Sequence, residues 1–194
     1  MPFIDTNIPD LKVFEPKIWR DDRGYFYECY NQQTFEKAGI KNRFVQDNQA
    51  LSTYGVLRGL HYQLPPFSQA KLVRVSQGEV LDVVVDIRPD SPTYGQHFSI
   101  RLSDANKTQL FVPKGFEHGY VVLSDTAIFA YKCDNLYSKA HDAGLYFNDP
   151  QLNIDCCRVT QDCFHKPSQY LQQLLLPHLQ NDPLKNIDEN QKSI

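Results

Sequence analysis

The sequence predicts an all-β protein, an antiparallel sandwich or barrel, and three observations support this. Short apolar runs recur about every ten residues through much of the chain, with turn-forming residues between them. The chain contains 11 Tyr and 12 Phe but one Met and one Trp, and aromatic residues favour strands over helices. Strands do not alternate with long helices, a pattern that would indicate a parallel sheet.

The first strands flank a turn. Residues 11–19 and 25–30 are expected to form strands, joined by RDDRG, in which Gly24 supplies a positive φ. In this reading Arg23 lies in a solvated turn, and Glu28 shares a strand face with neighbouring aromatic residues.

A short helix is expected next, at residues 31–38, with Asn31 as its N-cap and a glycine after its end. It is followed by the polar run Gln46, Asp47 and Asn48. Three such side chains are typical of a turn, and they can also hydrogen-bond a sugar or a base edge.

The second half of the chain supplies most of the β signal. The expected strands are KLVRVSQ, EVLDVVVDI, HFSIRLS, QLFVP, GYVVLSD and TAIFAYKCD. Asp86, within VVVDI, is expected to be buried and therefore to have a partner.

Past Asp155 the character of the chain changes. Residues 168–180 are expected to form a helix interrupted by Pro177, and the last residues a frayed end. We therefore expect a domain at 1–155 and a divergent C-terminal tail at 156–194 that is partly helical or frayed.

Composition narrows the class of protein. Hydrophobic residues make up 41% and charged residues 22%, as in ordinary globular domains, and the net charge of -3 argues against nucleic-acid and membrane surfaces as partners. Neither a signal-like N-terminus nor a membrane-length apolar run is visible, so we expect a cytoplasmic protein. The five Cys form no C-x-x-C pair, so we expect reduced thiols.

Two clusters carry chemistry. GVLRGLHYQ places Arg58 and His61 together, and Lys71 follows at the start of the next expected strand. A lone His is more often structural, but FVPKGFEHGY adds P-x-G-x-x-H, ending at His118. This pattern resembles the second motif of the cupin superfamily, whose jelly-roll barrels commonly hold a metal.

The first cluster differs from that of metal-binding cupins, which supply H-x-H. Here the corresponding stretch is HYQ, with one His, and two separated His make a poor transition-metal site. We therefore expect a cupin-type antiparallel jelly-roll barrel with a few short peripheral helices, no metal, and a mouth suited to proton transfer.

The chain from about residue 14 to 154 closely resembles the dTDP-4-dehydrorhamnose 3,5-epimerase family. The stretches that carry the resemblance are DDRGYFYE, FVQDN, GVLRGLHYQLPP, KLVRVSQGEVLDVVVDIRPDSPTYG, FVPKGFEHGYVVLSD, YKCDNLY and DPQLNID. Their order and spacing are intact, which makes the resemblance far more specific than a single motif.

The resemblance implies a substrate and a mechanism. The substrate is a dTDP-4-keto-6-deoxy sugar, in which the hydrogens on C3 and C5 are acidic because both carbons are α to the C4 ketone. By analogy His61 is the base, Tyr131 is the acid on the other face of the ring, and Lys71 lies near the enolate oxygen. No cofactor is expected.

The resemblance also implies binding residues and a homodimer. The residues that match family members holding the nucleotide sugar are Arg23, Glu28, Gln46, Asp47, Asn48, Arg58, His118, Tyr137 and Asp142. Of these, Arg23 and Glu28 are expected to reach in from the other subunit, and Tyr137 to stack on the thymine ring.

One departure stands out. The family usually continues into S-x-K-D, whose Asp pairs with the catalytic His, whereas here Asp155 is followed by Cys156 and Cys157 and that motif is absent. Asp162 is a candidate substitute, and an altered reading frame would account for the change. We expect weaker activity than in a relative that has the Asp.

Three alternatives stay open. The first is an epimerase acting at C3 or C5 alone on a related dTDP-sugar, which the motifs do not separate from the double epimerase. The second is a catalytically attenuated or silent homologue that binds the nucleotide sugar. The third is a metal-dependent cupin oxygenase, which metal analysis would decide.

Overall fold

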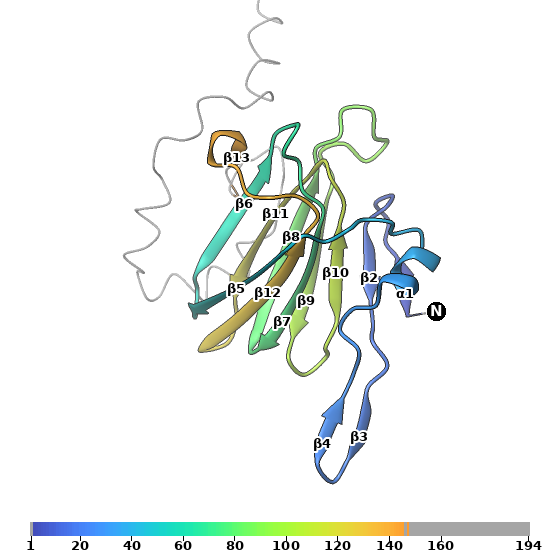
Figure 1. The fold of residues 1–194 in the computed structure, drawn as a ribbon. Coiled ribbons are helices and arrows are strands. Elements are labelled where there is room, and N and C mark those ends of the chain that lie inside the picture. The colour runs from blue at the N-terminus through green and yellow to red at the C-terminus, as the bar shows by residue number, and fades with distance from the viewer. Residues whose placement is uncertain (1, 146, 148–194) are drawn as a thin grey trace, which may run out of the picture.

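The computed structural model describes residues 2–145 and 147, which form two facing antiparallel sheets (Figure 1). One sheet has the order β1 (Phe3–Asp5), β2 (Lys12–Phe14), β10 (Gln109–Val112), β7 (Lys71–Gln77), β12 (Thr126–Cys133), β5 (Gln46–Thr53). The other has the order β13 (Asp142–Gly144), β6 (Leu57–Gln63), β11 (Phe116–Val122), β8 (Glu79–Asp86), β9 (His97–Ser103). The all-β architecture expected from the sequence is confirmed.

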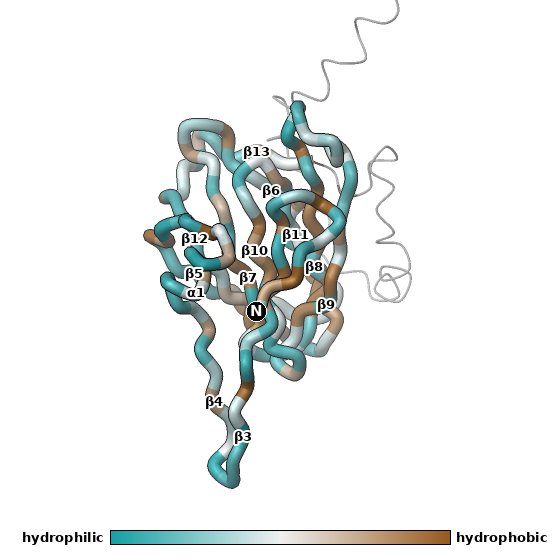
Figure 2. The backbone as a smooth tube through the Cα atoms, turned by 90° about the vertical axis from the view of Figure 1, so that its right-hand side faces the viewer, coloured by the Kyte–Doolittle hydropathy of each residue, from teal (hydrophilic) through white to brown (hydrophobic). Residues whose placement is uncertain are grey.

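The hydrophobic core lies between the two sheets. Side chains alternate along a strand, so each strand turns every second residue inward. Val73 of β7 and Leu110 of β10 belong to the same buried cluster as Val84 of β8 and Val122 of β11. The apolar stretches of these strands are the brown parts of the tube in the body of the molecule (Figure 2). Apolar packing therefore fixes the sheets relative to each other.

The expected helix is present as α1 (Gln32–Lys37). The Asn31 side chain caps it by accepting hydrogen bonds from the backbone N–H groups of Gln33 and Thr34. Phe35 is the buried residue of α1 and packs with Phe14 and other apolar side chains in a second cluster. The helix thus covers part of the outer face of the six-stranded sheet.

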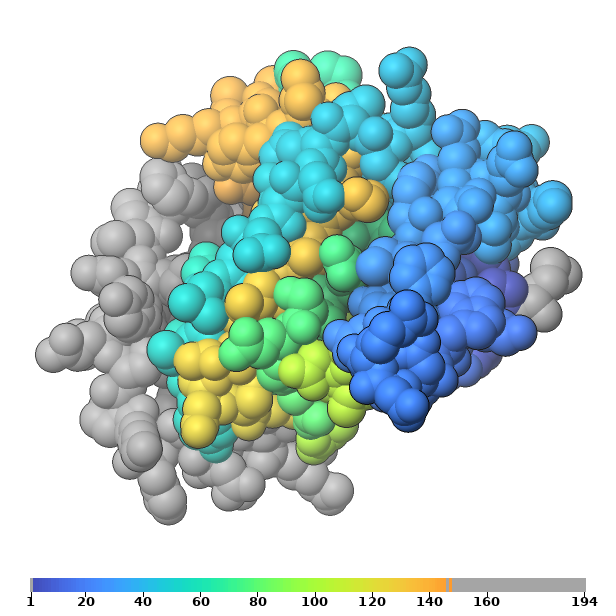
Figure 3. Space-filling view, turned by 60° about the horizontal axis from the view of Figure 1, so that its bottom comes forward, coloured from blue at the N-terminus to red at the C-terminus, as the bar shows by residue number. Residues whose placement is uncertain are grey.

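A hairpin projects from the body of the molecule. It consists of β3 (Trp19–Asp21) and β4 (Gly24–Phe26), which pair with each other, and all six residues are exposed. Figures 1 and 2 show the hairpin extending away from the sheets. Figure 3, in which the hairpin end of the molecule is turned toward the viewer, shows the N-terminal residues (blue) together on one flank.

The strands expected at 11–19 and 25–30 were too long. Pro16 interrupts the first of them, since proline lacks the N–H that a ladder needs, and Glu28 lies outside β4 in the segment leading to α1. Glu28 therefore does not share a strand face with its aromatic neighbours.

The turn expected at Gln46–Asn48 was also wrong. These residues begin β5, which pairs with β12 along its whole length, so that Gln46 lies opposite Cys133 and Asn48 opposite Tyr131. Pairing with a strand far away in sequence overrides the local turn preference.

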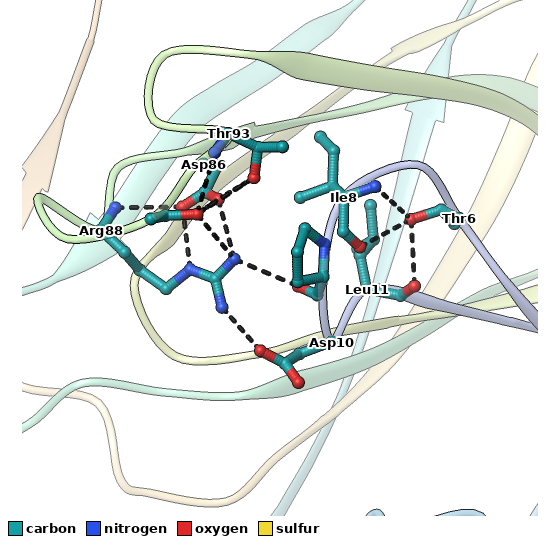
Figure 4. A network of polar contacts seen from close by, with 9 residues as sticks. Thr6, Ile8, Asp10, Leu11, Asp86, Arg88 and Thr93 are labelled. Carbon is teal, nitrogen blue, oxygen red and sulfur yellow. Dashed lines mark hydrogen bonds and ion pairs between the residues drawn. The ribbon is translucent and has the colours of Figure 1, made fainter.

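Asp86 is fully buried at the end of β8 and has the partners expected of it (Figure 4). Arg88 contacts both of its oxygens, through Nε at 2.9 Å and Nη2 at 2.8 Å, and Ser91 and Thr93 donate hydrogen bonds to Oδ2. Burial would raise the pKa of Asp86, but these hydrogen bonds lower it to about 2. Arg88 also contacts Asp10, which ties the N-terminal loop to the end of β8.

Among the described residues, none of the helices is long and apolar enough to cross a membrane. The helix expected at 168–180 and the tail at 156–194 lie outside the described residues.

Candidate active site

A pocket of about 330 Å³ opens where strands of both sheets end. Strands β5 and β7 begin there, and β6 and β12 end there, so side chains from the two sheets face each other across it. The residues that line it are Gln46, Asn48, His61, Gln63, Gln69, Lys71, Tyr131, Cys133, Tyr137 and Asp142.

The six-stranded sheet supplies one wall. Lys71, Cys133 and Gln46 lie side by side on the neighbouring strands β7, β12 and β5. Two residues away on β12, on the same face of the sheet, Tyr131 lies opposite Asn48 of β5. Lys71 is 5% exposed, so its ammonium group is largely withdrawn from solvent inside the pocket. This wall therefore presents a cation and a phenol.

The five-stranded sheet supplies the opposite wall, with His61 on β6. A Cβ atom at Gly59 would lie 3.1 Å from Nδ1 of His61 and only 2.5 Å from the backbone oxygen of His118. Gly59 also has φ +104, which favours glycine. The absence of a side chain at Gly59 therefore leaves room for the His61 ring beside its own strand.

The protonation states of these groups suit acid–base chemistry. Lys71 is the main cause of the low pKa of His61, followed by burial, His118 and Arg58, which together place that pKa well below the ordinary value. Burial lowers the pKa of Lys71 and raises that of Tyr131. At neutral pH the pocket therefore holds a neutral imidazole able to take a proton and a phenol able to give one.

The rim of the pocket is formed by the loop between β12 and β13. Tyr137 is exposed on this loop, before the 3-10 helix η1 (Lys139–His141), and its hydroxyl donates to Asp142 Oδ2 at 3.3 Å. The backbone N–H of Tyr137 also donates to the Gln46 side chain at 3.3 Å. The aromatic ring is thus placed at the edge of the pocket, open to solvent.

Sequence reasoning missed Gln63, Gln69 and Cys133. Gln63 donates to the backbone oxygens of Phe67 and Leu136 and accepts from Ser138 N–H, so it holds the loops on both sides of the pocket. Its place after His61 in HYQ is the one signal that could have found it. Burial raises the pKa of the Cys133 thiol to about 11, so this thiol is protonated and unreactive at neutral pH.

Other expected site residues lie away from the pocket lining. Arg23 is at the hairpin tip, exposed and paired with Asp21, and Glu28 borders a separate groove beside α1 and β2. Asp47 points to the opposite side of β5 from its neighbours, where its carboxylate lies 2.7 Å from Lys132 Nζ.

Arg58 and His118 lie beside the pocket on the same sheet as His61. Arg58 Nε donates to Ser52 Oγ at 2.9 Å, and His118, opposite His61 in the ladder, pairs with Asp82. The roles expected for these residues stay predictions. The described part of the chain contains no group of three or more His, Cys, Asp or Glu side chains placed to hold a metal ion.

The antiparallel barrel, with an imidazole and a phenol on opposite walls of one pocket, is typical of a class of protein: an enzyme that moves protons on a bound substrate, as epimerases do. The dTDP-4-dehydrorhamnose 3,5-epimerase family model matches residues 5–172, past the domain boundary expected at 155, and the chain belongs to this family.

Relatives and solved structures agree with this assignment. The chain is 54% identical over 156 residues to the dTDP-4-dehydrorhamnose 3,5-epimerase of Shigella flexneri, covering 80% of this chain and 86% of the relative. A Legionella pneumophila epimerase solved in complex with dTDP-4-keto-L-rhamnose is 52% identical with a TM-score of 0.77, covering 79% of this chain and 81% of that one.

A more distant neighbour is ChmJ from Streptomyces bikiniensis, a 3'-monoepimerase solved in complex with dTDP-quinovose. It is 33% identical with a TM-score of 0.72, and the match covers 77% of this chain and 76% of that one. The likeness to solved epimerases confirms the cupin-type jelly roll expected from the sequence. The region where the S-x-K-D motif would lie, with Asp162, is outside the described residues.

Proposed function

We propose that this protein epimerises dTDP-4-dehydro-6-deoxy-D-glucose at C3 and C5, giving dTDP-4-dehydro-L-rhamnose for dTDP-L-rhamnose biosynthesis. The observation that carries the proposal is one pocket with a neutral imidazole on one wall and a protonated phenol and a buried ammonium on the other. The name shared by the relatives supports the choice of substrate.

The chemistry follows from these three groups. The His61 imidazole takes the proton from C3 or C5, and the electrons of the C–H bond form an enolate whose charge rests on the C4 oxygen. The Lys71 ammonium stabilises that oxygen, more strongly in a buried pocket than in water. Tyr131 then donates its phenol proton to the carbon from the opposite face, which inverts the centre and restores the ketone.

The rim residues would hold the nucleotide. Tyr137 offers an exposed aromatic face for the thymine, and Gln46 and Asn48 line the same end of the pocket with hydrogen-bonding amides. Asp142 lies within reach of Tyr137, and the Arg58 guanidinium suits a pyrophosphate oxygen. These assignments remain proposals.

A single-centre epimerase is the second candidate. ChmJ, described as a 3'-monoepimerase, has the same fold, so the fold does not separate the two activities. The identity of 54% to a 3,5-epimerase, against 33% to ChmJ, favours the double epimerase.

We also propose a homodimer in which the β3–β4 hairpin contributes to the partner's site. The hairpin lies at the opposite end of the molecule from β13, which borders the pocket, so Arg23 is far from the pocket of its own chain (Figures 1 and 2). Trp19, Tyr25 and Phe26 are large apolar side chains that the isolated chain leaves exposed, as expected of an interface. A cytoplasmic location stays a prediction.

The direct test is proton NMR of dTDP-4-dehydro-6-deoxy-D-glucose with the protein in deuterated water. Loss of both the C3 and the C5 signals supports the double epimerase, and loss of one supports the second candidate. Loss of neither, with dTDP still binding, would mean that the protein is a silent homologue.

The roles of the two walls are tested by His61→Ala and Tyr131→Phe. Because general base and acid groups contribute about 10²- to 10⁴-fold, each variant should slow deuterium exchange or epimerisation by that order. Tyr120→Phe is the matched control, since it removes another buried phenol of the barrel that does not line the pocket. Exchange at the wild-type rate in His61→Ala would contradict the assignment.

A further inference from the structure

A row of three polar side chains crosses the five-stranded sheet on its inner face. His61 of β6 lies opposite His118 of β11, and Asp82 of β8 lies opposite Tyr120, two residues further along β11. His118 Nε2 is 2.9 Å from Asp82 Oδ2, and the rings of His61 and His118 meet edge to face with centroids 6.4 Å apart. The row runs from the pocket wall into the barrel interior.

The inner end of the row is buried among apolar residues. Asp82 is 0% exposed and His118 is 3% exposed, and strands β8 and β11 also contribute Val84 and Val122 to the core. Asp82 Oδ1 is buried without a hydrogen-bond partner among the described residues. A buried pair of this kind seldom stabilises a fold more than apolar side chains of the same size would. Its presence beside a pocket therefore calls for a functional explanation.

The hydrogen bond to Asp82 fixes the state of His118. Burial raises the pKa of Asp82, whereas His118 and Lys71 act in the opposite direction and favour its carboxylate form. An ionised Asp82 can only accept a hydrogen bond, which places a proton of His118 on Nε2 and restrains the ring. The groups that act electrostatically on His61, namely Lys71, His118 and Arg58, are all bases. Asp82 is the acidic group at the far end of the same row. Its negative charge also favours the protonated form of Lys71, because it raises the pKa of that ammonium group.

We propose that Asp82, acting through His118, is a positioning residue for His61. This inference rests on the proposed function, in which His61 takes the substrate proton. Asp82 touches no substrate, because it does not line the pocket and His118 stands between it and His61. The Asp82 carboxylate restrains the His118 ring, and the His118 ring in turn packs against the ring of His61 and limits its orientation. The negative charge of Asp82 also offsets the positive charge that forms when His61 is protonated.

The test compares Asp82→Asn with Asp86→Asn in the full-length protein. Asparagine keeps the shape of the side chain but offers an amide, so it neither carries the charge nor commits the His118 proton to Nε2. Asp86 is the matched control: it is an equally buried aspartate of the same strand, bound to Arg88 rather than to a histidine.

Two readouts separate positioning from structural support. In Asp82→Asn, kcat for epimerisation should fall about tenfold or more with KM within about twofold, as expected for a group that orients a catalytic histidine. In protein labelled with ¹⁵N-histidine, the ring signals of both His118 and His61 should shift, with assignments from His61→Asn and His118→Asn. Asp86→Asn should lower the unfolding midpoint but leave kcat of the folded protein and both sets of ring signals unchanged.

The proposal is overturned if Asp82→Asn keeps kcat within twofold of the wild-type value, or if the ring signals of His61 do not move. The spectroscopic readout needs no turnover. If the wild-type protein exchanges neither C3 nor C5 hydrogen, the proposed function fails, and an unmoved His61 signal in Asp82→Asn would separately reject the coupling of Asp82 to His61.

Discussion

At the scale of single residues, the pocket depends on where protons rest at neutral pH. His61 is surrounded by basic groups, with Lys71 the strongest influence, and its pKa is therefore well below 6.5. Burial also lowers the pKa of Lys71 from 10.5. A base must be neutral and an enolate-stabilising ammonium must be charged, so both shifts appear directly in the pH dependence of the rate.

We therefore expect kcat/KM to remain flat as the pH falls through 6.5 and to decline only below it, where His61 of the free enzyme gains a proton. On the alkaline side the rate should fall before pH 10.5, as Lys71 loses its proton. Because arginine keeps its charge above pH 12, Lys71→Arg should move the alkaline limb upward and leave the acid limb in place. An acid limb at or above pH 6.5 would contradict a lowered pKa for His61.

Residue types and spacing made the centre of the site predictable. His61, Lys71 and Tyr131 stand in sequence stretches that carry the family resemblance, and all three line one pocket. Gln63 and Cys133 stand in the same stretches but were missed, because their residue types do not indicate acid–base chemistry and their place in the cavity is evident only after folding. The contact of Asp82 with His118 joins residues on two strands, and local sequence says nothing about it.

At the scale of elements, strands with strong apolar patterns were predictable and strands with polar sequence were not. β7, β8 and β9 match the expected runs. The first three residues of β5 were read as a turn, because Gln46 and Asn48 face the pocket instead of the core and the strand is stabilised by pairing with β12. A functional strand thus departs from the apolar alternation on which sequence reading depends.

At the scale of elements, the close approach of β6 to β11 at Gly59 can be tested by substitution. A Cβ there would lie 2.5 Å and 2.7 Å from backbone atoms of His118 and Gly119, so Gly59→Ala must separate the strands as well as strain φ. We expect a loss of roughly 3 kcal/mol of unfolding free energy, measured in urea, together with a loss of activity because His61 moves.

Gly39→Ala is the control for that substitution. Gly39 also has a positive φ, but a Cβ there would meet nothing within 4 Å, so only the backbone strain remains. This variant should lose about 1 kcal/mol and keep its activity. Equal losses for the two variants would contradict the tight contact between β6 and β11.

At the scale of the whole molecule, the distance between the hairpin and the pocket makes the proposed dimer testable by mixing subunits. His61→Ala lacks the base and Arg23→Ala lacks the hairpin guanidinium, so each should be impaired alone. If Arg23 serves the partner's pocket, a mixed dimer has one site with both residues intact. Refolding the two variants together in equal amounts should then restore about a quarter of the wild-type rate, given random pairing in a symmetric dimer.

Without exchange of the hairpin, every site in the mixture keeps one defect, and no activity beyond the sum of the two variants should return. A mixture of His61→Ala with Tyr131→Phe is the control, because both residues line the pocket of one chain and mixing should therefore not recover activity. In that mixture a mixed dimer has one defect in each site, so the rate should stay low. The family resemblance already implied that Arg23 serves the other subunit, but local sequence did not show the separation from its own pocket, which depends on the projecting hairpin.

The buried row of Asp82 and His118 has a consequence for how this protein would respond to selection. Within the part of the chain that the structure describes, one oxygen of the Asp82 carboxylate is buried without a hydrogen-bond partner, and apolar replacements for such buried pairs are often neutral or stabilising by about 1–4 kcal/mol. A population of variants selected for heat resistance alone should therefore accumulate apolar residues at these two positions. Selection for rhamnose production at the same temperature should retain them, so the two regimes would drive one barrel along separate evolutionary paths.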